Sequence, residues 1–262
     1  PGCKINIGLN ITEKRVDGYH NLESIFFPIN LSDILEIVPD DHFSIHTTGL
    51  NIDGDHSDNL VVKAYYLLQD EYRLPPVKIH LHKIVPMGAG LGGGSADGAF
   101  ALVALNQLFN LNISTDELET YADQLGSDCA FFIQNKPAFI QGKGEIVQPI
   151  DFQLEGYHIY LINPKKHIST KEAFGGITPT LSSIDLKNAV QKNPADWKNE
   201  IKNDFEASIF PHHPDLAAIK EKLYANGALY ASMTGTGSTV YGIFKDAPQP
   251  LYPNHFEWIA KL

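Results

Sequence analysis

The sequence is poor in cysteine and has no long apolar run. Cys3 and Cys129 are its only cysteines, and their separation does not suggest a disulfide framework. No apolar stretch approaches the about 18 residues that a membrane span needs. The N-terminus lacks a basic and apolar signal segment. Because the chain starts at Pro1 rather than at Met, we expect a few leading residues to precede it. These absences favour the cytoplasm.

Basic residues are also scarce. The chain has 20 Lys and Arg against 31 Asp and Glu, which gives a net charge of -11. Nucleic acids and anionic membranes are bound through a basic footprint, so neither is expected as a partner. An anionic small-molecule substrate is compatible with this charge only if backbone N–H groups or local positive charge offset it. The sequence does not indicate an oligomeric state.

Glycine, by contrast, is concentrated in one place. Five of the seven positions from Gly88 to Gly94 are glycine, within the stretch Pro86-Met87-Gly88-Ala89-Gly90-Leu91-Gly92-Gly93-Gly94-Ser95-Ala96. Backbone N–H groups can close around an anion where side chains are this small, and the helix that follows adds its own N-terminal N–H groups. The stretch predicts a phosphate-binding loop, with a structural turn as the alternative. Ser95 could cap the helix, bind a phosphate oxygen or ligate magnesium.

The loop carries neither the signature of a Walker P-loop nor that of a protein kinase, and it meets the dinucleotide-binding pattern only in the spacing of its glycines. No Gly-Lys-Ser/Thr follows it, which excludes a Walker P-loop, and no His-Arg-Asp or Asp-Phe-Gly triplet indicates a protein kinase. Gly88-x-Gly90-x-x-Gly93 does satisfy the dinucleotide-binding pattern. However, the preceding strand, 77–83, alternates between apolar and polar residues, whereas a central parallel strand is apolar throughout. The acidic residue expected about 20 positions further on is also missing.

Strands and helices are mixed along the chain without βαβ regularity, which predicts an α+β fold. The helix over 114–125 has the clearest start, because Ser114 and Glu117 fit a capping box. The second half begins near Asp151, so we expect domains at 1–150 and 151–262. We expect strands at 4–11, 22–31, 35–38, 43–46, 77–83, 157–162 and 239–244, helices at 60–72, 96–109, 114–125 and 214–224, and the start of a helix at 170–174. The region 185–210 is predicted as helical with interruptions, and the tail from Asp246 as a packed extension.

Three separated segments resemble the three motifs of the GHMP kinases, the superfamily of galactokinase, homoserine kinase and mevalonate kinase. They are Lys4-Ile5-Asn6-Ile7-Gly8-Leu9, the glycine-rich loop 86–96, and Thr234-Gly235-Thr236-Gly237-Ser238. Arg15-x-Asp17-Gly18-Tyr19-His20 and Leu125-Gly126-Ser127-Asp128 are similar to the branch whose substrate is 4-diphosphocytidyl-2-C-methyl-D-erythritol. Gly2-Cys3 and Gly98 depart mildly from that pattern, at positions where no chemistry is expected.

The resemblance implies a two-domain α+β fold with the nucleotide loop in the N-terminal half, a ferredoxin-like C-terminal half and the active site in the cleft between them. It also implies that the γ-phosphoryl group of ATP, accompanied by Mg²⁺, is transferred to the 2-hydroxyl of the methylerythritol moiety, a step of non-mevalonate isoprenoid synthesis. The loop residues 86–96 are then the ATP-binding residues. Lys83 lies near the adenine or ribose, or is solvated.

The resemblance assigns the catalytic roles to Lys4 and Asp128. From its position alone, Asp128 could be the N-cap of the next helix, and Lys4 could be a solvated charge on a strand. The family pattern instead makes Asp128 the base and pairs it with Lys4, which stabilises the transferring phosphoryl group. Such transfer depends mainly on positioning and charge stabilisation.

The substrate-binding residues are likewise implied by the resemblance. Tyr19 stacks on the cytosine ring, His20 bonds its polar edge, and Phe174 closes the other face within the looser match Ile168-Ser169-Thr170-x-x-x-Phe174. Asn6 and Thr170 are assigned to the same substrate. Gly235 and Gly237 let the backbone approach the phosphates or the glycine loop, which is compatible with a tight turn.

Two rival functions stay open at this point. Another GHMP kinase, of the homoserine or mevalonate type, would have no use for the Tyr19-His20 pair. A nucleotide-binding module without catalysis would need neither Lys4 nor Asp128. His80 and His82 share a strand face, but no third metal ligand is evident beside them.

Overall fold

The computed structural model describes residues 1–52 and 54–262 and contains two compact units. Unit 1 comprises Pro1–Cys3, Asn30–Met87 and Gly92–Lys136, and unit 2 comprises Lys4–Ile29, Gly88–Leu91 and Pro137–Leu262. Each unit thus draws on separated parts of the chain, and the domain boundary at residue 150 remains a prediction. Within the described residues, no helix combines the length and apolar character needed to cross a membrane.

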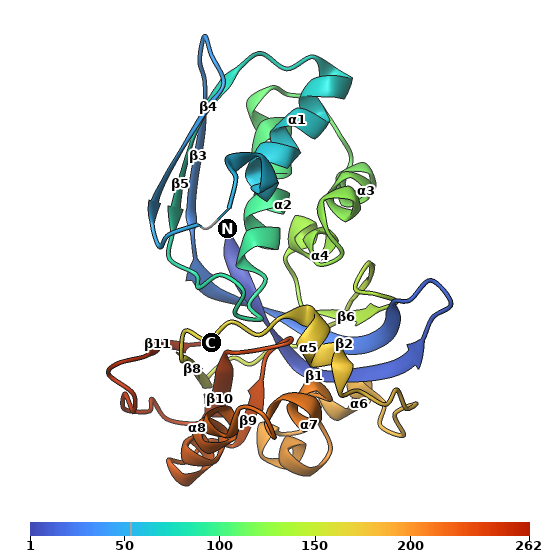
Figure 1. Cartoon of the computed structure of the whole chain (residues 1–262), viewed down its shortest axis with the longest axis vertical. Helices are drawn as coiled ribbons and strands as arrows, with labels where there is room; N and C mark the ends of the chain where they lie inside the picture. The colour runs from blue at the N-terminus through green and yellow to red at the C-terminus, as the bar shows by residue number, and fades with distance from the viewer. Residues whose placement is uncertain (53) are drawn as a thin grey trace. The chain divides into compact units, whose positions relative to one another are not determined.

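Unit 1 contains a three-stranded sheet with the order β3-β5-β4, beside which lie the helices α1 and α2 (Figure 1). The predicted alternation of β5 is confirmed, because its apolar side chains are buried on one face. The alternation argued against a central parallel strand, but β5 is the middle strand of this sheet, antiparallel to β3 and parallel to β4. The bounds are β3 Ile34–Pro39, β4 Ser44–Gly49, the 3₁₀ turn η1 His56–Asp58, α1 Leu60–Tyr72, β5 Val77–Lys83 and α2 Gly93–Leu108.

Unit 1 also contains α3 (Thr115–Leu125) and α4 (Cys129–Gln134). The predicted capping box is present, since the Ser114 hydroxyl accepts from the Glu117 N–H and the Glu117 carboxylate accepts from the Ser114 N–H. Such reciprocal bonds satisfy two of the N–H groups that a helix leaves unpaired at its start. Gly126 is the C-cap of α3, so the next helix begins only three residues later, just after Asp128.

A four-stranded sheet with the order β1-β2-β6-β7 lies mostly in unit 2. Its first strand does not leave Lys4 solvated, which was the alternative considered from its position alone. Lys4 and Asn6 are buried like the isoleucines beside them and have polar partners elsewhere in unit 2, whereas Asn10 is 8% exposed. The bounds are β1 Gly2–Lys14, β2 His20–Ser32, β6 Ala138–Gln141 and β7 Ile146–Pro149.

The second sheet of unit 2 is antiparallel, with the order β11-β8-β10-β9. The tail is more than a packed extension, because its last residues form β11 and pair Trp258 with Leu161. Leu216, Ile219 and Leu223 of α8 pack in one apolar cluster with residues of β8, β9 and β10. The bounds are β8 His158–Asn163, α5 Thr170–Gly175, α6 Leu186–Ala189, η2 Pro194–Asn199, α7 Phe205–Ile209, α8 Pro214–Ala225, β9 Tyr230–Met233, β10 Val240–Phe244 and β11 Phe256–Lys261.

Candidate active site

The glycine-rich loop has the backbone of an anion cradle. Gly88, Gly90 and Gly92 have φ angles of 59°, 77° and 70°, in the left-handed region that glycine adopts without steric cost. Gly92 is the N-cap of α2, and as a glycine it has no side chain with which to cap the helix. The N–H groups of the first turn of α2 therefore keep their capacity to bind an anion.

The helix begins earlier than the predicted 96–109. Because α2 starts at Gly93, Ser95 is its third residue and is not the N-cap, which corrects one of the three roles considered for Ser95. Burial raises the pKa of the Cys129 thiol to about 12, and a hydrogen bond between Ser95 and this thiol offsets part of that rise. Cys129 is therefore a buried, protonated thiol and is unsuited to nucleophilic chemistry. The roles of Ser95 toward phosphate and magnesium remain predictions.

The turn 234–238 lies directly against the glycine loop within unit 2. The Thr239 N–H donates to the Ala89 carbonyl at 3.2 Å, and the Thr234 hydroxyl lies 3.0 Å from the Gly90 carbonyl. A Cβ atom on Gly90 would stand 1.9 Å from the Thr234 carbonyl oxygen, and one on Gly235 would stand 3.1 Å from Gly90. Glycine is thus required at Gly90, because two backbones meet there, and a larger residue at Gly235 would crowd the backbone of Gly90.

Gly237, the other predicted glycine of this turn, donates its N–H to the Thr234 carbonyl at 3.0 Å. This bond closes a tight turn, which is the structural role considered for the segment. Contact of Gly235 and Gly237 with substrate remains a prediction.

Lys4 and Asn6 lie side by side on β1, and both contact this assembly. The Lys4 Nζ donates to the Asn6 Oδ1 at 2.7 Å and to the Gly90 carbonyl at 3.1 Å, and it lies 4.4 Å from the centre of the Phe26 ring. The Asn6 N–H donates to the Thr234 hydroxyl at 3.0 Å, and the Asn6 Nδ2 donates to the Ser24 hydroxyl. The lysine is 3% exposed, so it is a fixed charge at the glycine loop and not a solvated one.

Asp128 is at the N-cap position of α4, but its side chain makes no capping hydrogen bond. The N-cap position considered for this residue is therefore confirmed, without capping through its carboxylate. Its side chain is half-buried. Asp128 belongs to unit 1 and Lys4 to unit 2, and the pairing of the two side chains remains a prediction.

The residues predicted to hold cytosine are found in unit 2, and two of them are in contact. The rings of His20 and Phe174 stack with centroids 4.7 Å apart and an interplanar angle of 21°. Burial and the nearby charge of Lys14 lower the pKa of His20, which favours a neutral imidazole with one donor and one acceptor nitrogen. Tyr19 is 61% exposed, so its ring does not pack in the protein interior, as a tyrosine directly after a turn often does.

The turn before Tyr19 is fixed by Asp17, whose carboxylate accepts from Arg15 Nε and from the Tyr19 N–H. The hydrogen bond with Arg15 lowers the pKa of this carboxyl. Thr170 is the exposed first residue of α5, the helix that carries Phe174. The contacts of Tyr19, His20, Thr170 and Phe174 with a ligand remain predictions.

Lys83 is enclosed in unit 1 by two carboxylates. It is 2% exposed, and its Nζ forms ion pairs with Asp33 and, at 2.6 Å, with Asp97. Asp33 also accepts from the N–H groups of Ile84 and Val85. The structure therefore does not match the solvated alternative for Lys83, and its contact with adenine or ribose remains a prediction.

Sequence reasoning missed the two carboxylates of this cluster. Asp97 lies in the second turn of α2, so the cluster connects the end of β5 to the helix that follows the glycine loop. Burial raises the pKa of Asp97 to about 7, against the lowering effect of Lys83. The only signal in the sequence was an acidic residue inside an otherwise apolar helix, which pairs with a lysine 14 positions earlier.

No group of three or more His, Cys, Asp or Glu that could hold a metal ion is found in residues 1–52 and 54–262. The rings of His80 and His82 each lie 2.9 Å from the Thr48 hydroxyl, which gives both a neutral hydrogen-bonding partner. The two histidines therefore have a hydrogen-bonding partner within the sheet β3-β5-β4.

Two family models match the chain. The model of the GHMP kinases N terminal domain matches residues 59–142, and the model of the GHMP kinases C terminal domain matches residues 185–251. Together these segments cover the loop 86–96, Asp128 and the turn 234–238.

Curated relatives and solved structures agree with these matches. The chain is 53% identical to the 4-diphosphocytidyl-2-C-methyl-D-erythritol kinase of Bacteroides thetaiotaomicron over 249 residues, covering 94% of this chain and 91% of that one. It is 45% identical to the protein of the same name from Parabacteroides distasonis, covering 100% and 98%. A crystal structure of 4-(cytidine 5'-diphospho)-2C-methyl-D-erythritol kinase matches with a TM-score of 0.80 and 28% identity, covering 92% and 87%.

A homoserine kinase from Cytophaga hutchinsonii also matches, with a TM-score of 0.62 and 15% identity, covering 93% of this chain and 85% of that chain. At this identity the likeness concerns the fold alone. The two-domain α+β fold predicted from the sequence is the fold that these matches share.

Proposed function

Because this chain belongs to the GHMP kinase family, we propose that it is an enzyme that transfers the γ-phosphoryl group of ATP to the 2-hydroxyl of 4-diphosphocytidyl-2-C-methyl-D-erythritol. The observation that carries the proposal is the near-full-length identity of 45–53% to relatives of that name. The Asp17-Gly18-Tyr19-His20 turn, with the His20–Phe174 stack behind it, supports the choice of a cytidine substrate.

In this proposal the phosphates of ATP are bound by main-chain N–H groups. The first turn of α2 and the left-handed glycines before it supply donors without side-chain bulk. Lys4, bonded to the Gly90 carbonyl, places one positive charge at the same loop. These groups stabilise the charge that spreads over the transferring phosphoryl oxygens.

The proposed transfer breaks the bond between the γ-phosphorus and its bridging oxygen and forms a bond from that phosphorus to the substrate 2-oxygen. The hydroxyl proton passes to the carboxylate of Asp128. Lys4 stabilises the developing negative charge. Because the transition state of such transfers is loose, positioning and charge stabilisation contribute more than proton removal.

Mg²⁺ is proposed to accompany ATP and to neutralise phosphate charge. Mg²⁺ prefers water and phosphate oxygens to a cage of protein ligands. The donor set fits this behaviour, since Ser95, in the first turn of α2, offers a hydroxyl oxygen rather than a cluster of carboxylates. Ser95 is the protein ligand that we propose.

The proposal is tested by an ATP-dependent phosphorylation assay with 4-diphosphocytidyl-2-C-methyl-D-erythritol, homoserine and mevalonate in parallel. We expect turnover with the cytidine substrate and at least about 10²-fold less with the other two, because a cytosine site left empty loses its stacking and edge hydrogen bonds. Turnover of homoserine or mevalonate alone would replace the proposal by the rival kinase, and ATP binding without any turnover would support the non-catalytic module.

A further inference from the structure

Residues 202–206, which we call the bracing segment, run along β1, the strand that carries Lys4 and Asn6. The Leu9 N–H donates to the Lys202 carbonyl at 2.8 Å, and the Asp204 N–H donates to the Leu9 carbonyl at 2.8 Å. The Ile11 N–H donates to the Asp204 carboxylate at 2.7 Å. These bonds fix the bracing segment to β1 as a short parallel bridge at Leu9 and Asn203.

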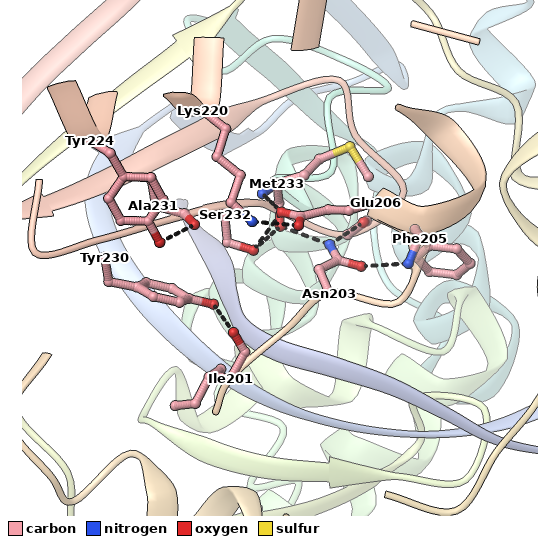
Figure 2. A network of polar contacts seen from close by, with 11 residues as sticks. Ile201, Asn203, Phe205, Glu206, Lys220, Tyr224, Tyr230, Ala231, Ser232 and Met233 are labelled. Atoms are coloured by element: carbon pink, nitrogen blue, oxygen red, sulfur yellow. Dashed lines mark hydrogen bonds and ion pairs between the residues drawn. The ribbon is translucent and has the colours of Figure 1, made fainter. Parts of the chain in front are cut away.

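From this segment the side chain of Asn203 reaches the end of β9 (Figure 2). Its Nδ2 donates to the Met233 carbonyl at 2.7 Å and to the Gly235 carbonyl at 2.9 Å, and its Oδ1 accepts from the Phe205 N–H at 3.0 Å. Asn203 is 2% exposed. Because two acceptors face the nitrogen and one donor faces the oxygen, the orientation of the amide is determined by its partners.

Glu206 binds the N–H group of Met233, the residue whose carbonyl Asn203 binds (Figure 2). Its Oε1 accepts from the Met233 N–H at 2.8 Å and from the Ser232 hydroxyl at 3.1 Å, and its Oε2 accepts from Lys220 Nζ at 2.5 Å. β9 is an edge strand of its sheet, so its outward backbone groups have no neighbouring strand. Side chains of the bracing segment take that place at Met233, directly before the turn 234–238.

The turn 234–238 contacts both β1 and the glycine loop through Thr234. The Thr234 hydroxyl accepts from the Asn6 N–H and lies 3.1 Å from the Asn6 Oδ1 and 3.0 Å from the Gly90 carbonyl. Asn6 and Gly90 also accept hydrogen bonds from the Lys4 ammonium. A shift of the turn therefore changes the surroundings of both the proposed phosphate cradle and the proposed catalytic lysine.

We propose that Asn203 and Glu206 are positioning residues for the phosphoryl transfer, which act by holding the turn 234–238 against Gly90 and Asn6. The inference rests on the proposed function. It assigns to these two side chains an effect on the ATP side of the reaction, because they bond the end of β9 and the turn, and the turn contacts the glycine loop. Among the described hydrogen bonds and ring contacts, Asn203 and Glu206 do not contact Tyr19, His20 or Phe174. Phe205 of the same segment packs edge-on against Phe174 and bonds to Asn203, so Glu206 gives the cleaner separation from binding of the cytidine moiety.

The test compares Asn203→Ala and Glu206→Ala with wild type in the full chain. We expect kcat to fall at least about tenfold, because misplacement of catalytic groups by about 1 Å costs up to about 10² in rate. The Kd for magnesium adenylyl imidodiphosphate, an ATP analogue, should rise about tenfold, and the Kd for cytidine diphosphate should stay within about twofold. Glu206→Gln should recover most of the loss, because the amide oxygen still accepts from the Met233 N–H.

Two controls separate positioning from general destabilisation. Lys220→Met removes the ion pair of Glu206 and a cation–π contact with Phe210, and it should leave the kinetics of both substrates near wild type. Ile219→Ala opens a cavity in the apolar cluster of the same unit and lowers stability without removing a hydrogen bond of the turn. If Asn203→Ala and Glu206→Ala weaken both nucleotides equally, or match Ile219→Ala in their kinetics, the inference is wrong.

Thr234→Val keeps the test decisive if the alanine variants do not fold. Valine has nearly the shape of threonine but lacks the hydroxyl that connects the turn to Asn6 and Gly90. We expect the same separation, with weaker binding of the ATP analogue and unchanged binding of cytidine diphosphate. Normal analogue binding and turnover by Thr234→Val would overturn the inference. If wild type binds both nucleotides but phosphorylates no alcohol, the proposed function fails while the binding measurements still decide the role of the bracing segment.

Discussion

At the scale of single residues, the proposed site is built from polar groups that are buried yet have partners. Burying a charge or an amide without a partner costs several kcal/mol, so such residues persist only where their contacts are specific. Lys4 satisfies this condition with Asn6 and the Gly90 carbonyl, and Lys83 does so with Asp33 and Asp97. Their charges are therefore held in place before any ligand binds.

Lys4→Ala and Asp128→Asn are each expected to lower kcat by at least about 10²-fold, because one removes charge stabilisation and the other removes the proton acceptor. ATP should still bind, since main-chain N–H groups are proposed to supply most of its contacts. Steady-state kinetics and titration calorimetry measure the two effects. Lys78→Ala, an exposed lysine on β5, is the matched control. Near-normal turnover in both variants would remove the catalytic assignment.

Tyr19→Ala is expected to raise KM for the cytidine substrate about twofold to tenfold, the equivalent of the about 0.5–1.5 kcal/mol that ring stacking contributes. KM for ATP should not change, because Tyr19 is an exposed residue at the cytidine end of the proposed site. Tyr19→Phe keeps the ring and should behave as wild type. An unchanged KM in Tyr19→Ala would place the cytosine elsewhere.

Asp97 predicts a pH dependence of stability. Its pKa is about 7 in the folded protein against an ordinary value of 3.8, so between these two pH values the folded state holds a proton that the unfolded state has released. The stabilisation from this group is therefore fully present below about pH 4 and declines as the pH rises to about 7. The Tm of wild type minus that of Asp97→Asn should fall from pH 5 to pH 8. Asp215→Asn, at an exposed ion pair, should show no such trend.

At the scale of elements, the glycine loop is shaped by the close approach of a second backbone. The N–H groups in the first turn of α2 have no acceptor within the helix because they lie at its start. The path of Gly88–Leu91, in contrast, is determined by the turn 234–238. A loop rich in glycine has many accessible conformations, and ordering it costs entropy. Contacts with Thr234, Thr239 and Lys4 compensate part of that cost before ATP binds.

Gly90→Ala is expected to weaken binding of the ATP analogue at least about tenfold, because the added Cβ would meet the Thr234 carbonyl oxygen and displace the loop. Gly156→Ala is the matched control. Gly156 also has a positive φ, of 83°, but a Cβ there meets nothing within 4 Å. Both variants incur the left-handed penalty of about 1–2 kcal/mol, and only the first should lose nucleotide affinity.

At the scale of the whole molecule, the net charge of -11 opposes the approach of two anionic substrates. The proposed function is compatible with this charge because the phosphates would be bound by neutral N–H donors with a positive helix end, together with Lys4. The overall field thus reduces nonspecific binding of polyanions, while the local donors retain affinity for a phosphate of the right shape.

Binding of both substrates should be visible in the stability of the full chain. The ATP analogue at 100 times its Kd should add about 2.7 kcal/mol to the free energy of unfolding, and cytidine diphosphate at the same excess should do the same. Thermal denaturation should show a rise in Tm of several degrees for each ligand. NAD⁺ is the control for the dinucleotide-binding pattern in the loop. A rise with NAD⁺ alone would favour a dinucleotide-binding site at the loop.

The sequence by itself determined the features that depend on neighbours along the chain. The capping box at Ser114, the alternation of β5 and the glycine run before α2 were all recognised, because such patterns act over a few residues. The motif order also indicated the family. The start of α2 was misplaced by three residues, since glycine is a poor helix former and the run concealed the first turn.

Only the tertiary structure decided which polar residues meet. The contacts of Lys83 with Asp33, of Asn203 with Met233 and of Asn6 with Thr234 join residues 50, 30 and 228 positions apart. No local pattern encodes such pairs, because they depend on how separate elements pack. For the same reason the alternative of a solvated Lys4 could be rejected only in the fold, where the lysine is buried, and the bracing segment was predicted only as part of an interrupted helix.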